Sequence, residues 1–106
     1  MAVPKSIVLN GCEIQTKMVK HICRDNNHYG EYSSCDMCIN IDPDISEQKQ
    51  ELIYCHEVIE AIKDIYLLDD LKHDLIQPIA VAMYELIKKK QLIFEGDIEE
   101  VVAIDA

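Results

Sequence analysis

The feature that most constrains this chain is a segment near its middle with the periodicity of an amphipathic helix. Ser46 is a natural N-cap, and the sequence predicts a helix from about Glu47 to Leu68. Apolar residues recur along this segment at helical spacing, at Leu52, Cys55, Ile59, Ile62 and Tyr66. We expect this stripe to face a sheet, with polar side chains on the opposite side of the helix.

His56 and Glu60 lie one helical turn apart in this segment, at the rim of the apolar stripe. Side chains four residues apart stack on one face of a helix, so this imidazole and carboxylate could hold two positions on a zinc ion. The adjacent Glu57 could then act as a general base on a bound water. The well-known form of this arrangement is His-Glu-x-x-His, and Glu60 here replaces the second histidine.

A catalytic zinc site usually needs a third protein ligand in addition to a water molecule. The nearest candidates surround the start of the next helical segment, and of these His73 is the best by its chemistry, ahead of Asp70 and Asp74. A competing interpretation makes His56 a half-buried histidine on an amphipathic helix. Short motifs have many accidental matches, so the spacing leaves both interpretations open.

The rest of the chain predicts a small α+β domain. Asn10-Gly11 is a strong signal for a hairpin within residues 6–20, and residues 29–33 and 36–41 form a second pair of strands. A second helix is expected over residues 71–90, with its regular part beginning near Asp74 or later so that Pro78 falls in the first turn or two. We expect a single domain over residues 1–106, with a core of 6–90 and a tail of 91–106, in which a mostly antiparallel sheet packs on two helices.

Charge is distributed unevenly along the 106 residues. Residues 1–40 hold four basic and four acidic side chains, whereas residues 41–106 hold six and sixteen, so the net charge of −10 lies in the second part. Such a surface repels nucleic acid and anionic membranes, which argues against them as partners. The negative charge either attracts cations and basic peptides or only keeps the protein soluble, and both interpretations stay open. No apolar run is long enough to span a bilayer and no signal-peptide pattern is present, which predicts a soluble intracellular protein.

Five cysteines form an odd set, and without a secretory signal we expect them to be reduced. Cys35 and Cys38 form a single Cys-x-x-Cys pair, whose zinc-binding partners would have to be Cys12, Cys23 or His28. One such pair is a weak signal, so structural cysteines are the favoured interpretation.

The strand-to-helix pattern and the central motif together resemble small zincin-like proteins of bacteria and their phages, a minimal form of the gluzincins. The resemblance rests on residues 29–33, 39–42 and 46–49, and above all on Leu52-Ile53-Tyr54-Cys55-His56-Glu57-Val58-Ile59-Glu60-Ala61-Ile62. It implies a small sheet laid against an active-site helix, followed by a second helix that typically supplies a glutamate.

Carried over residue by residue, the resemblance makes His56 the first zinc ligand and Glu57 the general base, and it places Glu60 at the second ligand position. The position of the second-helix acid falls on or near Ala80, and His73 or Glu85 would have to substitute for it. The function expected is that of a zinc metallopeptidase in the cytoplasm of a bacterial or phage-infected cell, with a protein or peptide as its partner. The alternative is a catalytically inactive scaffold whose acidic half binds a basic protein as a regulator or inhibitor.

Overall fold

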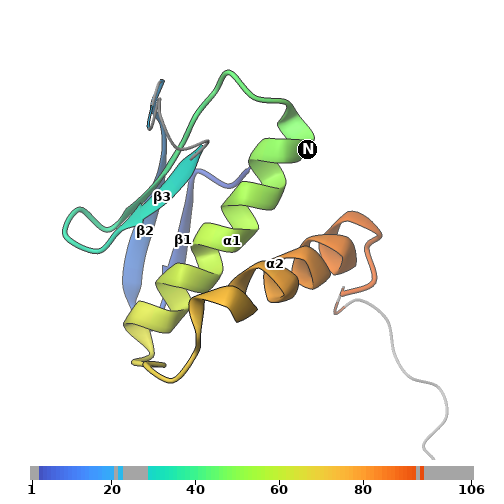
Figure 1. Cartoon of the computed structure of the whole chain (residues 1–106). Coiled ribbons are helices and arrows are strands. Elements are labelled where there is room, and N and C mark those ends of the chain that lie inside the picture. Colours follow the sequence, from blue (N-terminus) through green and yellow to red (C-terminus); the bar gives the residue numbers. More distant parts are fainter. Residues whose placement is uncertain (1–2, 21, 23–28, 93, 95–106) are drawn as a thin grey trace, which may run out of the picture.

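The fold is α+β, as the sequence predicts. The computed structural model describes residues 3–20, 22, 29–92 and 94. Within this part of the chain four strands are followed by two helices (Figure 1), namely β1 (Ser6–Leu9), β2 (Cys12–Met18), β3 (Gly30–Ser33), β4 (Cys38–Ile41), α1 (Glu47–Ile65) and α2 (His73–Lys88). The residues expected to form the C-terminal tail lie outside the described part from residue 95 onward.

The four strands form one mostly antiparallel sheet in the order β1-β2-β4-β3. β1 and β2 form the predicted hairpin, in which Asn10 and Gly11 have φ values of 50° and 77°. These positive values at both positions are those of a type I′ turn. β3 and β4 also pair antiparallel, whereas β2 and β4 are joined as parallel neighbours. β3 is therefore an edge strand.

α1 begins and ends with regular capping structures. The Ser46 hydroxyl accepts a hydrogen bond from the Lys49 backbone N–H at 3.2 Å. At the other end Leu67 has a φ of 56°, and the N–H of Leu68 donates to the carbonyl of Lys63. This is a Schellman motif, and it ends the helix at Ile65, three residues before the predicted boundary.

α1 lies between the sheet and α2, so it buries two faces (Figure 1). Tyr54 and Ala61 pack toward the sheet with Ile14, Ile39 and Ile41. The prediction that the stripe through Cys55 and Ile59 faces the sheet was wrong, because these residues pack on α2 with Ile76, Ala80 and Tyr84. Periodicity shows that a face is buried, but the identity of the neighbouring element depends on tertiary packing.

A buried carboxylate also links the two helices. Glu51 on α1 is 4% exposed and accepts hydrogen bonds from the Tyr84 hydroxyl at 2.9 Å and from Lys88 Nζ at 3.3 Å, both on α2. Burial, followed by the contact with Glu51, raises the pKa of Tyr84.

Pro78 falls in the second turn of α2, which begins at His73, one residue before the start predicted. Neither of the described helices has both the length and the apolar character that a membrane span requires.

Candidate metal centre

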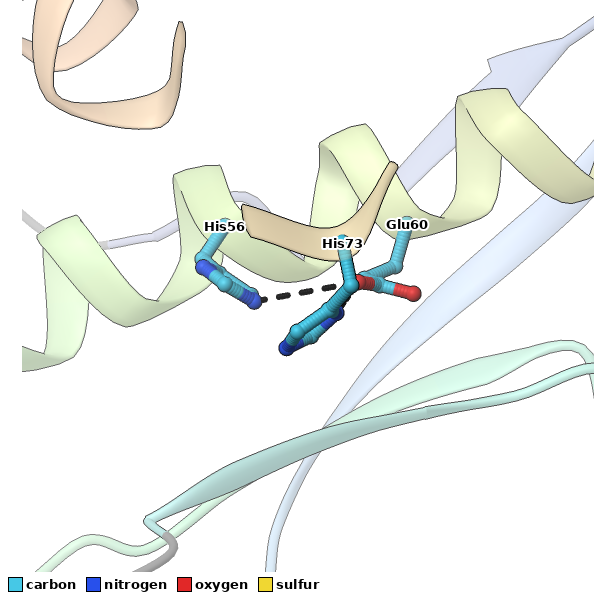
Figure 2. A group of neighbouring side chains, drawn as sticks. All are labelled: His56, Glu60 and His73. Carbon is cyan, nitrogen blue, oxygen red and sulfur yellow. Dashed lines mark hydrogen bonds and ion pairs between the residues drawn. The ribbon is translucent and has the colours of Figure 1, made fainter. Parts of the chain in front are cut away.

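Three side chains that can bind a metal converge where α2 begins against α1. His56 and Glu60 come from α1, and His73 is the first residue of α2 (Figure 2). One potential ligand atom from each residue lies within 4.8 Å of the other two. The Schellman motif and the short connection after it turn the chain back, so His73 reaches the face of α1 that carries the other two residues. The group could hold a metal ion, as the sequence predicts for these residues.

The distances among the three residues are close to those that a single ion would require. Glu60 Oε1 lies 3.8 Å from His56 Nε2 and 2.9 Å from His73 Nδ1. The two rings meet edge to face, with centroids 5.7 Å apart and planes at 72°. Ligand atoms at zinc bonding distance in a tetrahedral site are about 3.3 Å apart. The two distances from Glu60 lie on either side of this value, so side-chain rotations would have to adjust them before one ion could contact all three residues.

The group of His56, Glu60 and His73, called the centre below, lies at the boundary between core and solvent. The side chains of His56 and Glu60 are 20% and 27% exposed, which agrees with their predicted place at the rim of the apolar face. His73 is 77% exposed and covers them from α2. Two of the candidate ligands are thus held by the packing of α1, while the third lies on the solvent side, from which an ion could enter.

Gln77 fixes the orientation of His56. Its side-chain oxygen lies 2.7 Å from His56 Nδ1. Because an amide oxygen can only accept a hydrogen bond, Nδ1 is the donor in this contact, and Nε2 is the nitrogen on the side of Glu60. Metal-binding histidines are commonly oriented in this way through their second nitrogen. Gln77 was not among the residues predicted from the sequence, although its position four residues after His73 places it on the same face of α2.

Glu57, the expected general base, lies between two hollows that adjoin the centre. It is 8% exposed. Glu57 and His56 both line a groove of about 620 Å³. The other residues that line this groove are Tyr29, Gly30, Lys49, Leu52, Ile53 and Gln77. The same two residues line a smaller hollow of about 280 Å³, completed by Glu31, Tyr32, Glu60 and His73. Glu57 is therefore placed beside the candidate ligands and next to the space that a ligand molecule would enter.

Tyr32 on β3 borders the smaller hollow and is bonded to α1. Its hydroxyl donates to Asp64 Oδ2 at 2.9 Å. Desolvation, with additional contributions from the hydrogen bond and the negative charge of Asp64, raises the pKa of Tyr32 from its ordinary value of 10.0 to about 12. The contact ties the edge strand to the helix that carries the metal centre.

This pKa predicts a loss of stability at alkaline pH. Between about pH 10 and 12 the unfolded tyrosine loses its proton while the folded one keeps it, so the free energy of unfolding falls as pH rises through this window. Above pH 10 the free energy of unfolding of Tyr32→Phe, measured with urea, is expected to fall less steeply with pH than that of the wild type. Tyr66→Phe, at an exposed tyrosine, is the control. Equal alkaline slopes for the wild type and both variants would contradict the prediction.

Other candidates from the sequence lie apart from the centre. Ala80, the position expected for a second-helix acid, is fully buried in the core, and exposed Glu85 pairs with Lys89 at 2.8 Å. Cys35 is exposed in a turn, whereas Cys38 is buried in β4, and both are free thiols. Of their suggested partners, Cys12 is a half-buried free thiol at the start of β2, whereas Cys23 and His28 lie outside the described residues.

Comparison of the chain with protein-family models, with curated proteins and with solved structures found no match.

Proposed function

We propose that this protein is a zinc-dependent peptidase in which His56, Glu60 and His73 bind the metal and Glu57 is the general base. One observation carries the proposal. Relative to the His-Glu-x-x-His pattern with a glutamate on the next helix, this chain has an acid at position 60 and a histidine at position 73. The two departures compensate in composition, because the residues that meet in space are two imidazoles and one carboxylate, with His73 at the start of α2 in place of an acid near Ala80. That donor set is one of those used by catalytic zinc sites.

The donor set also favours zinc over the common hard cations. Magnesium and calcium prefer oxygen ligands, whereas imidazole suits zinc and its neighbours in the transition series. Three protein ligands leave a fourth position for water or substrate. Where His73 Nδ1 is the ligand atom, the ring would carry its proton on Nε2 instead of donating it from Nδ1 to Glu60. Because imidazole binds a metal only in its neutral form, binding should weaken at low pH.

The protein residues around the centre have distinct roles in this proposal. A bound zinc ion would supply Lewis-acid polarisation and lower the pKa of a water molecule. Gln77 keeps the His56 ring in the tautomer that leaves Nε2 unprotonated. Glu57, adjacent to His56 and lining both hollows, accepts the proton of the attacking water and returns it to the leaving amine.

A peptide is the substrate class that the surroundings favour. β3 is an edge strand, and its residues Gly30 and Tyr32 line the hollows on either side of Glu57. An edge strand offers unpaired backbone N–H and C=O groups, which can bind an extended peptide by strand addition. A peptide bound in this way would lie along the cleft between β3 and α1.

Metal analysis tests the first part of the proposal. We expect the wild type to bind one equivalent of zinc, and His56→Ala or His73→Ala to reduce its affinity by at least about 100-fold, because each removes a ligand. Gln77→Ala should cost about 10- to 100-fold, the usual effect of losing a group that orients a ligand. Affinity is measured by competition with a chromophoric chelator. Asp74→Asn, which removes a nearby acid outside the group, is the matched control, and equal affinities for all four variants would disprove the site.

The alternative function is binding of a basic protein by the acidic second half of the chain. A hollow beside the centre is lined by three acidic residues and one lysine, and it gives this alternative a defined surface with an excess of negative charge. The four residues are Glu60, Asp64, Asp69 and Lys63. The two functions separate experimentally. A regulator keeps its biological effect in Glu57→Gln and loses it when Asp64, Asp69 and Asp70 are replaced by lysine. A peptidase loses its effect in Glu57→Gln and keeps it when the three aspartates are replaced.

A further inference from the structure

α2 carries a second apolar stripe that no described element covers. Its first stripe, through Ile76, Ala80 and Tyr84, is buried against α1. The second stripe consists of Leu75, Ile79, Ala82 and Leu86, all exposed. Their spacing of four, three and four residues is that of the core positions of a helix–helix seam. Exposed apolar residues in such a continuous row commonly mark an interaction site.

We infer that this second stripe is the interface of a symmetric homodimer in which α2 packs antiparallel against α2 of a second copy. The stripe is self-complementary in that arrangement. A two-fold axis between residues 80 and 81 places Leu75 opposite Leu86 and Ile79 opposite Ala82, so that a large side chain meets a small one at the centre. Such an isologous contact is the commonest way in which identical chains associate.

The charges at the two ends of α2 select the antiparallel orientation. Residues 69–74 contain three aspartates and one lysine, for a net charge of −2 with His73 neutral. Residues 85–90 contain three lysines and one glutamate, for a net charge of +2. An antiparallel pair brings each acidic end to a basic end, whereas a parallel pair would bring like ends together.

The apolar surface continues past both ends of the stripe. A 16-residue helix is about 24 Å long, and one such contact is small against the roughly 1,000 Å² that a specific interface needs. Leu67 and Leu68 are exposed just before α2, and Leu92 and Phe94 just after it. An antiparallel copy brings the first pair of one chain to the same end as the second pair of the other, which enlarges the interface. None of the apolar residues of this interface belongs to the group His56, Glu60 and His73.

Sedimentation equilibrium of the full chain tests the interface. The wild type should be a dimer at micromolar to sub-millimolar concentration, and Ile79→Lys should weaken the association by about 100-fold, because each dimer loses two buried isoleucines. Val81→Lys is the matched control, because Val81 is 43% exposed beside 42% for Ile79 but lies off the stripe. Circular dichroism confirms folding of both variants. A monomeric wild type, or equal effects of the two substitutions, would overturn the proposal.

Charge variants test the orientation without touching the stripe. Two double variants should each weaken self-association, because the two ends of α2 then carry net charges of the same sign. They are Lys89→Glu with Lys90→Glu, and separately Asp69→Lys with Asp70→Lys. An equimolar mixture of the two double variants should restore a heterodimer, detected by native mass spectrometry. Failure of the mixture to associate while the wild type dimerises would overturn the antiparallel arrangement.

Discussion

Glu57→Gln is expected to lower the rate of peptide hydrolysis by about 10²- to 10⁴-fold while zinc binding is retained. The change keeps the size of the side chain but removes its ability to accept a proton, and general-base catalysis typically contributes that much. Glu57 is not one of the three residues that could hold the ion, so the metal content should stay at the wild-type level. Hydrolysis is followed with a quenched fluorescent peptide library, in parallel with metal analysis.

The matched control for this experiment is Glu31→Gln. Glu31 lines the same small hollow as Glu57, but it is exposed and accepts a hydrogen bond from Asn40. Its substitution should leave kcat within a few-fold of the wild type. Full activity in Glu57→Gln would exclude this residue as the base. Zinc binding by the wild type without any hydrolysis would favour the regulatory alternative and leave the metal site intact.

Gly30→Ala is expected to destabilise the protein by about 1–3 kcal/mol, the usual cost of overpacking a core. A Cβ at Gly30 would meet Ile53 Cγ2 on α1 and would lie 3.3 Å from the Asn40 carbonyl oxygen. Neither neighbour can yield easily, because the isoleucine is β-branched within a helix and the other atom belongs to the sheet backbone. The midpoint of urea unfolding measures the effect.

The same substitution should also affect the centre, because the added Cβ would lie 3.6 Å from Glu57 Cγ. A shift of α1 away from β3 moves Glu57 with it. The Ile53→Ala background provides the control, since it removes the methyl group that the new Cβ meets. Gly30→Ala should cost much less stability in that background than in the wild type, and an equal cost in both would refute the close approach of β3 to α1.

Local features of the fold are determined by the sequence. Asn10-Gly11 predicts a type I′ hairpin because few other residues tolerate positive φ at both positions, and the structure has this turn. Ser46 predicts the start of α1 through its hydroxyl, and the structure confirms that cap. The stacking of His56 and Glu60 follows from helix geometry alone, and so does their position at the edge of the buried surface.

Only the tertiary structure decided which distant groups meet. His73 reaches Glu60 because the Schellman motif at Leu67 redirects the chain after α1, and no periodicity in the sequence reports that direction. The same packing brings Gln77 to His56 and assigns Cys55 and Ile59 to α2 instead of the sheet. Side-chain spacing within one element is fixed by backbone geometry, which each residue imposes on its neighbours. The approach of two elements is fixed by the packing of whole surfaces, to which many residues contribute at once.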